Sequence, residues 1–98
     1  MSAESSNGKR IVREFKVDNH YGIHARPAAL IVKAASQFDA EIDVEKDGSI
    51  VSGKSIMGLM TLEAGPGSVL RITAEGPDCE EALDHLEQLI VQRKFDED

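Results

Sequence analysis

The stretch "RIVREFKVD", residues 10–18, alternates apolar and polar side chains with a period of two. Successive side chains of a strand point to opposite faces of a sheet, so this period is typical of a half-buried strand. One face would carry Ile11, Phe15 and Val17, and the other Val12, Glu14, Lys16 and Asp18. We therefore predict a strand here, with the first set facing the core.

From Ala25 to Phe38 the period changes to that of a helix. The apolar residues that recur along one side are Leu30, Ile31, Ala34, Ala35 and Phe38. A single apolar stripe of this kind predicts an amphipathic helix packed on a sheet.

Two short strands follow in "EIDVEKDGSIVS", residues 41–52, joined at Lys46-Asp47-Gly48. The Asp-Gly pair tolerates the positive backbone angles of a tight hairpin turn. Ile42 and Val44 lie two residues apart, so we expect both to face the core.

The next segment, "SIMGLMTL" at residues 55–62, predicts a short helix with Ser55 as its N-cap. "GPG" at residues 65–67 is a loop that ends any helical path. Alternation then returns in "SVLRITAE", residues 68–75, which predicts a strand whose inner face carries Leu70, Ile72 and Ala74.

A last helix is predicted after Asp78, because Asp78 with Glu81 three residues later forms a start like a capping box. Its apolar stripe consists of Ala82, Leu83, Leu86, Leu89 and Ile90. Cys79 near this helix start is interpreted as a small packed hydrophobic residue and not as a reactive thiol.

The predicted order of elements is strand, helix, strand, strand, helix, strand, helix (βαββαβα). The apolar stripes of the helices would all have to pack on the one apolar face of the sheet. We therefore predict an α+β fold, an open two-layer sandwich, in one domain over residues 10–93. Residues 1–9 are predicted to be a mobile polar tail, and residues 94–98 ("KFDED" begins at Lys94) a solvated acidic end.

The composition and net charge of the chain limit the classes of partner that it can bind. The chain has 98 residues, 41% of them hydrophobic and 30% charged, which suits one globular domain. A net charge of −7 opposes binding to nucleic acid or anionic lipid, so proteins or small molecules are the expected partners. A single cysteine, no secretory signal and no long apolar run indicate a cytoplasmic protein without membrane insertion. We also expect a monomer.

The chemistry begins at "YGIHARPAAL", residues 21–30, where His24 stands on the threshold of the first helix. The backbone amides of Ala25 and Arg26 would be among the unpaired donors of the helix end, where the helix dipole favours an anion. Pro27 stiffens the first turn at no loss of a hydrogen bond. The Arg26 guanidinium can hold phosphate oxygens with two hydrogen bonds, so we expect a phosphate site.

Histidine suits a carrier because a neutral imidazole is nucleophilic near neutral pH and its phosphoryl adduct remains labile. The alternative is that His24 is a plain polar helix cap, but its conjunction with Gly22, Arg26 and Pro27 favours function. His20 lies in a loop without further ligands of convincing metal spacing, and His85 falls on the polar side of the last helix. No metal and no cofactor are expected.

Together, "GIHARPAAL" and "GKSIMGLMTL", followed by "GSVLRITAEGPDCEEAL", closely resemble HPr, the histidine-containing phosphocarrier of the bacterial phosphoenolpyruvate-dependent sugar phosphotransferase system. The resemblance covers roughly residues 11 to 92. It implies an open-faced sandwich of four antiparallel strands with three helices on one side. It also implies that Enzyme I phosphorylates His24 on Nδ1 and that the phosphoryl group is then transferred to IIA domains of sugar permeases. Arg26 would contact the phosphoryl group. Such a protein is a carrier whose partners supply the catalysis.

The resemblance assigns Ser55 to a regulatory phosphorylation site of an HPr kinase/phosphorylase; the alternative is an N-cap that is never modified. It also places an apolar partner patch beside the histidine. We call this set the α-patch, and its members are Ala29, Val32, Ile56, Met57 and Met60. Core packing is the alternative for the side chains of the short helix, with Met57 and Met60 divided between patch and core.

Three features depart from the family: a longer N-terminal tail, Tyr21 in place of a smaller residue, and the acidic C-terminal extension. Two alternatives to the sugar branch stay open. The first is a carrier of a nitrogen-related or purely regulatory branch, and the second is a protein-binding regulator whose His24 is never phosphorylated.

Overall fold

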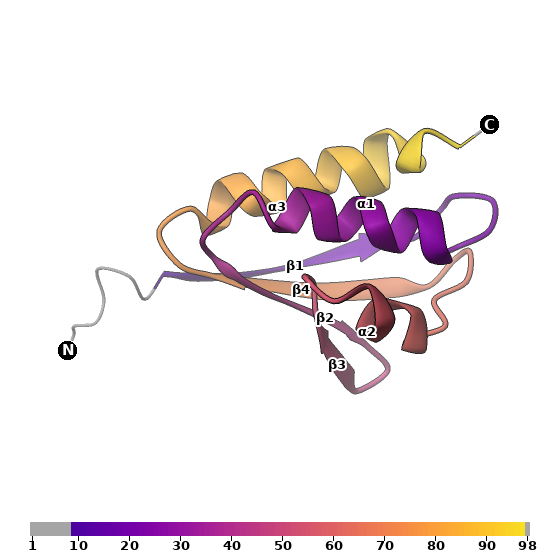
Figure 1. Cartoon of the computed structure of the whole chain (residues 1–98), viewed down its shortest axis with the longest axis horizontal. Helices are drawn as coiled ribbons and strands as arrows, with labels where there is room; N and C mark the ends of the chain where they lie inside the picture. The colour runs from indigo at the N-terminus through magenta and orange to yellow at the C-terminus, as the bar shows by residue number, and fades with distance from the viewer. Residues whose placement is uncertain (1–8, 98) are drawn as a thin grey trace.

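The four strands of the protein form one antiparallel sheet, and the helices pack on one of its faces (Figure 1). The structure is a computed structural model, and it describes residues 9–97. The strands lie in the order β1-β4-β2-β3. Their bounds are β1 Arg10–Lys16, β2 Glu41–Lys46, β3 Ser49–Ser52 and β4 Val69–Glu75. The helices are α1 Ala25–Ala35, α2 Ile56–Thr61 and α3 Cys79–Glu87, which continues into a π-helical turn η1 Gln88–Gln92 and a 3-10 turn η2 Lys94–Asp96. The predicted element order is confirmed. The predicted tail falls, apart from Lys9, outside the described residues.

The alternation of the strands places one apolar set between sheet and helices. β4 lies between β1 and β2, with Phe15 opposite Leu70 and Val44 opposite Ile72. All four of these side chains are buried. The residues predicted for the stripe of the last helix, Ala82, Leu83, Leu86, Leu89 and Ile90, are buried as well. The predicted α+β open-faced sandwich is therefore confirmed.

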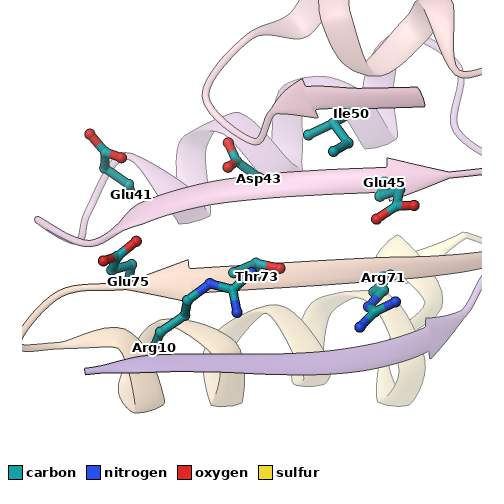
Figure 2. A pocket seen from close by; sticks show the side chains of 8 residues that line it. All are labelled: Arg10, Glu41, Asp43, Glu45, Ile50, Arg71, Thr73 and Glu75. Atoms are coloured by element: carbon teal, nitrogen blue, oxygen red, sulfur yellow. The ribbon is translucent and has the colours of Figure 1, made fainter. Parts of the chain in front are cut away.

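No helix of residues 9–97 covers the other face of the sheet, which is lined mainly by polar side chains, with Ile50 among them (Figure 2). Opposite charges lie across the strands here, with Arg10 opposite Glu75 and Glu45 opposite Arg71. Such pairs stabilise neighbouring strands by a few tenths of a kcal/mol to about 1 kcal/mol. Most charged residues of the strands thus lie on the solvent face, as the period of two requires, and Arg13 is an exception that faces the helix layer.

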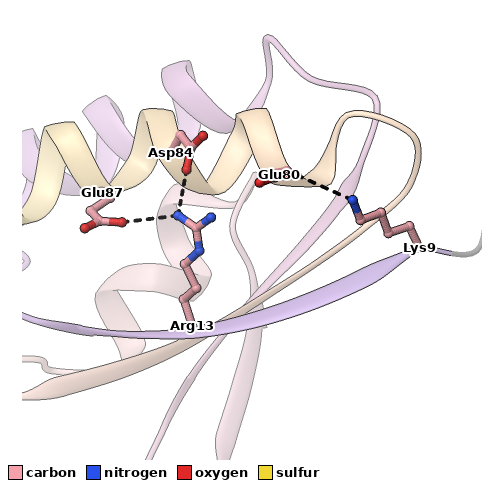
Figure 3. Close-up of polar contacts among 5 residues, drawn as sticks. All are labelled: Lys9, Arg13, Glu80, Asp84 and Glu87. Atoms are coloured by element: carbon pink, nitrogen blue, oxygen red, sulfur yellow. Dashed lines mark hydrogen bonds and ion pairs between the residues drawn. The ribbon is translucent and has the colours of Figure 1, made fainter.

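Ion pairs also connect the edge strand to the last helix (Figure 3). The Arg13 Nη1 atom lies 2.8 Å from Asp84 Oδ1 and 3.2 Å from Glu87 Oε1, and Lys9 Nζ lies 3.5 Å from Glu80 Oε1. The hydrogen bond to Asp84 is the main reason that the pKa of Arg13 is raised. These contacts fix β1 against the helix layer at its N-terminal end.

The hairpin turn has the predicted geometry. Asp47 and Gly48 both have positive φ, 51° and 87°, the backbone that the Asp-Gly pair accommodates. Ile42 and Val44 are buried, as predicted.

The prediction that the first helix reaches Phe38 is wrong, because α1 ends at Ala35. Phe38 lies in the following turn, where its ring packs edge-on against His85 with centroids 5.7 Å apart. Its carbonyl oxygen accepts a hydrogen bond from Lys54 Nζ at 3.0 Å. The apolar ring of Phe38 thus packs against a residue of α3 and does not continue the apolar stripe of α1. His85, which was predicted on the polar side of the last helix, is half-buried in this contact.

Asp78 is the N-cap residue of α3, at the predicted helix start, but the side-chain hydrogen bond of a capping box is absent. Its two carboxylate oxygens instead accept the backbone N–H groups of Asp39 and Ala40, each at 2.8 Å. The carboxylate thus connects the entry of β2 to the entry of α3. Cys79, the first residue of α3, is fully buried, as predicted.

The C-terminal segment is not the solvated end that its charges predicted. Phe95 is 0% exposed and belongs to the hydrophobic core. Lys94, Phe95 and Asp96 have φ values of 48°, 58° and 55°, a left-handed backbone that residues other than glycine rarely adopt. Burial of the Phe95 ring supplies the favourable free energy that offsets this backbone. Asp98 lies outside the described residues.

Candidate functional site

The site is built at the start of α1. His24 is the N-cap residue, with extended backbone angles of −99° and −162°, and its side chain makes no capping hydrogen bond. The first amides of a helix have no intrahelical acceptor, which leaves the N–H groups of Ala25 and Arg26 directed at the space before the helix. Pro27 is buried in the first turn. The helix end therefore has the character of an anion site.

The loop before His24 is fixed by close backbone contacts. The Ile23 N–H donates to the Ala64 carbonyl at 2.8 Å. Gly22 has φ 71°, and a Cβ atom at this position would lie 2.4 Å from Ala64 O. Only glycine fits both the space and the backbone angle. Gly22 thus sets the path by which the chain presents His24.

The imidazole of His24 is accessible: its side chain is 45% exposed. The ring of Tyr21 stands edge-on to it at 5.9 Å between centroids, and Tyr21 in turn packs edge-on against His20. Tyr21 is itself strongly exposed. The imidazole at this place is accessible to another protein without rearrangement of the fold.

Arg26 lies in the first turn and is exposed, but its guanidinium already has a partner. Its Nη1 atom donates to the Phe95 carbonyl oxygen at 2.9 Å. A guanidinium has five N–H donors, so this bond engages one of them. The sequence placed Arg26 at the phosphate site, and the structure adds that the same side chain connects the site to η2.

Glu97 is a site residue that the sequence analysis missed. Its Oε2 atom lies 3.3 Å from His24 Nε2 and accepts a hydrogen bond from Asn19 Nδ2 at 2.8 Å. Its Oε1 atom accepts the His20 N–H at 2.9 Å. Desolvation would raise the pKa of the Glu97 carboxyl, but the hydrogen bonds from Asn19, His24 and the backbone lower it below its usual value. The only sequence signal was a carboxylate in a short acidic tail.

Asn19 connects Glu97 to the loop. Its side chain is buried, and Nδ2 donates both to Glu97 and to the Gly22 carbonyl oxygen, the latter at 2.9 Å. Since both partners are acceptors, the amide nitrogen must face them. One buried amide therefore holds the loop and the C-terminal segment together beside His24.

Ser55 caps α2, as predicted. Its hydroxyl oxygen accepts the Gly58 N–H at 3.0 Å. A Cβ at Gly58 would lie 3.1 Å from both Ser55 Oγ and Val51 Cβ, so the cap is closely packed. The half-buried Ser55 side chain stands immediately before the exposed residues of α2.

The α-patch residues of α2 face solvent. Met57 is 74% exposed, and Ile56 and Met60 are each 40% exposed. On α1, which contacts α2, Ala29 is exposed and Val32 is half-buried. Met57 and Met60 therefore belong to the surface, with Leu59 as the buried residue of the helix.

Within residues 9–97, no group of three or more histidine, cysteine, aspartate or glutamate side chains is arranged to hold a metal ion. The same part of the chain contains no helix long and apolar enough to cross a membrane.

Comparison with known proteins identifies relatives over most of the chain. Residues 11–92 match the family model described as "PTS HPr component phosphorylation site". The phosphocarrier protein HPr of Treponema pallidum is 50% identical over 88 residues, which is 90% of this chain and 99% of that protein. The HPr-like protein Crh of Halalkalibacterium halodurans is 46% identical over 78% of this chain and 90% of its own length.

A solved structure agrees with these relatives. The crystal structure of HPr-C-His from Thermoanaerobacter tengcongensis has a TM-score of 0.82 and 47% identity, and the match covers 92% of this chain and 98% of that one. The family model, the curated relatives and the solved structure thus point to the same family. The chain belongs to the HPr family of phosphocarrier proteins.

Proposed function

We propose that this chain carries a phosphoryl group on His24, received from phospho-Enzyme I and passed to IIA domains of sugar permeases. The observation that carries the proposal is the 45% exposed imidazole of His24 at the N-terminus of α1, beside the Arg26 guanidinium. A nucleophile, an anion-binding helix end and a permanent cation then meet at one accessible point.

In the transfer step, the lone pair of His24 Nδ1 attacks phosphorus. The bond between phosphorus and the donor breaks, and its electron pair stays with the donor. The amides of Ala25 and Arg26 and the partial positive charge of the helix end, about half an elementary charge, stabilise the transferred group. Transfer to the acceptor is the same step in reverse, with the acceptor as nucleophile.

Arg26 completes this site by contacting the phosphoryl oxygens. Its bond to the Phe95 carbonyl leaves further N–H donors of the guanidinium for an anion. A charge-assisted hydrogen bond to phosphate is stronger than one to a neutral carbonyl, so a bound phosphoryl group can also draw Nη1 away from Phe95.

Partners dock on the α-patch. Exposed methionines suit a surface that meets several different proteins in turn, because their unbranched side chains adapt to different shapes. Met57 and Met60 are both exposed. Ala29 and Val32 follow His24 along α1, and α1 contacts α2, so we expect a partner that covers the patch to reach His24.

Ser55 is the regulatory site, phosphorylated by an HPr kinase/phosphorylase. Its hydroxyl stands at the N-terminus of α2, where the helix end tolerates a phosphate. The added group would carry nearly two negative charges beside Ile56 and Met57. Burying that charge under a partner is unfavourable, so modification weakens docking and slows transfer to His24.

The proposal is tested by a relay with purified components: phosphoenolpyruvate, Enzyme I, this chain and a IIA acceptor. We expect acid-labile phosphate on the wild-type chain and its loss on addition of the acceptor. His24→Ala should take up no such phosphate, while His20→Ala, the matched control in the adjacent loop, should behave as wild type. Labelling of His24→Ala to the wild-type level would contradict the proposal. Uptake without transfer to any IIA domain would indicate a purely regulatory branch.

A further inference from the structure

The carboxylate of Glu97 is held on both of its oxygens beside the ring of His24. Oε1 accepts the His20 N–H at 2.9 Å, and Oε2 accepts Asn19 Nδ2 at 2.8 Å. Oε2 also lies 3.3 Å from His24 Nε2. With its side chain only 12% exposed, Glu97 is not a freely moving surface glutamate.

The segment before Glu97 explains why it stays there. The Phe95 ring is fully buried, and the Phe95 carbonyl accepts the Arg26 hydrogen bond at 2.9 Å. Lys94 Nζ lies 3.6 Å from Asp18 Oδ2. Contacts with the core, with α1 and with the loop after β1 therefore converge on the four residues 94–97.

The contact determines which ring nitrogen carries the hydrogen. An ionised carboxylate only accepts hydrogen bonds, so the Nε2 atom facing Glu97 must be the N–H of the imidazole. A neutral imidazole has a single N–H, and Nδ1 then keeps its lone pair. We infer that Glu97 is a positioning residue that holds His24 in the Nε2–H form, so that Nδ1 is the nucleophile. This inference deepens the proposed function and rests on it.

The arrangement allows phosphoryl transfer without any movement of a proton. As Nδ1 bonds to phosphorus, the donor leaves with its electron pair and the ring gains a positive charge, while the hydrogen remains on Nε2 next to the carboxylate. When the phosphoryl group departs, the electron pair of the Nδ1–P bond returns to Nδ1 and the ring is neutral again. Glu97 stabilises the charged ring in both directions through a charge-assisted hydrogen bond.

Two variants separate this role from a general effect of charge. Glu97→Gln replaces the carboxylate by an amide that can donate as well as accept. Glu80→Gln, on α3 beside Lys9, removes one negative charge far from His24 and serves as the matched control. Neither glutamate belongs to the α-patch, so docking should be unchanged in both.

The first measurement is the ¹⁵N spectrum of the His24 ring, recorded without partners at a pH where the ring is neutral. We expect the Nε2–H form in the wild type and in Glu80→Gln, with an Nε2–H proton signal protected from exchange with water. In Glu97→Gln that protection should be lost and the Nδ1–H form should appear. A wild-type ring that carries its hydrogen on Nδ1, or spectra identical in Glu97→Gln and Glu80→Gln, would overturn the inference.

The second measurement is the steady-state rate of phosphorylation by phospho-Enzyme I. We expect kcat to fall about 10-fold in Glu97→Gln with KM unchanged, by analogy with the 10- to 100-fold losses typical when a metal-binding histidine loses the partner that orients it. Equal kcat for Glu97→Gln and Glu80→Gln would overturn the inference even if the wild type is phosphorylated. If the wild-type chain itself takes up no phosphate, the proposed function fails, and the ring spectra still decide where the hydrogen lies.

Discussion

The Arg26 guanidinium donates a hydrogen bond to the Phe95 carbonyl oxygen at 2.9 Å, which links the candidate phosphate site to a residue sixty-nine positions later in the chain. The Phe95 ring is buried in the core while its backbone lies beside α1. The C-terminal segment is therefore part of the site's construction.

Phe95→Ala should destabilise the protein by about 4 kcal/mol, because removal of a buried aromatic ring leaves a cavity. Tyr21→Ala, the matched control at a strongly exposed aromatic residue, should change stability by less than about 0.5 kcal/mol. Denaturant unfolding measures both. Equal, small effects would mean that Phe95 does not belong to the core.

Gly22→Ala should destabilise the protein by about 3 kcal/mol, since the new Cβ would meet Ala64 O at 2.4 Å on a backbone with φ 71°. Gly48 also has a positive φ, 87°, but nothing lies within 4 Å of its Cβ position. Gly48→Ala should therefore lose only about 1 kcal/mol. Thermal or denaturant unfolding of the two variants separates the effect of the steric clash at Gly22 from that of the positive φ angle, which both positions share. A smaller loss of stability in Gly22→Ala than in Gly48→Ala would contradict the described path of the loop.

Ser55→Asp should reduce the rate of His24 phosphorylation by Enzyme I about 10-fold, equivalent to about 1.4 kcal/mol for desolvating a charge beside the α-patch. Ser49→Asp, in the exposed hairpin strand, adds the same charge and should leave the rate unchanged. Ser55→Ala should keep the rate but lose about 1 kcal/mol of stability with the cap to Gly58. Equal rates for Ser55→Asp and Ser49→Asp would exclude the proposed regulation.

Glu97 should make the stability of the protein depend on pH. Desolvation would raise the pKa of its carboxyl, but hydrogen bonds from Asn19, His24 and the backbone outweigh it and keep the folded-state pKa below the ordinary value of 4.5. A lowered folded-state pKa gives stability that is complete above the unfolded-state value and is lost as the pH falls through the folded-state value.

Unfolding of wild type and Glu97→Gln at a series of pH values measures this contribution. The wild type should be the more stable protein near neutral pH, and its advantage should shrink progressively once the pH falls below 4.5. A difference that grows on acidification would have the wrong sign for a carboxylate stabilised by hydrogen bonds.

The sequence predicted the elements because strand and helix periods depend on which residues meet the core. Phe15, Val44 and Ile72 follow the period of two and are buried together. The Ser55 cap was equally predictable, since the hydroxyl oxygen of a serine one residue before a helix accepts an N–H group only three residues later.

The errors concern partners that are distant in sequence. The Asp78 carboxylate binds the amides of Asp39 and Ala40, which the local pattern of α3 cannot indicate. Phe95 stands alone among charged residues, so no periodicity marked it as core, and the left-handed turn around it has no glycine to signal it. The contact of Glu97 with His24 depends on that turn and was missed for the same reason.

The most direct test is to locate the phosphate on the wild-type chain after reaction with phosphoenolpyruvate and Enzyme I, by fragmentation mass spectrometry of samples kept at alkaline pH. We predict a single phosphoryl group on His24. A phosphate on His20, His85 or Ser55 with His24 unmodified, or no phosphate at all, would contradict the account.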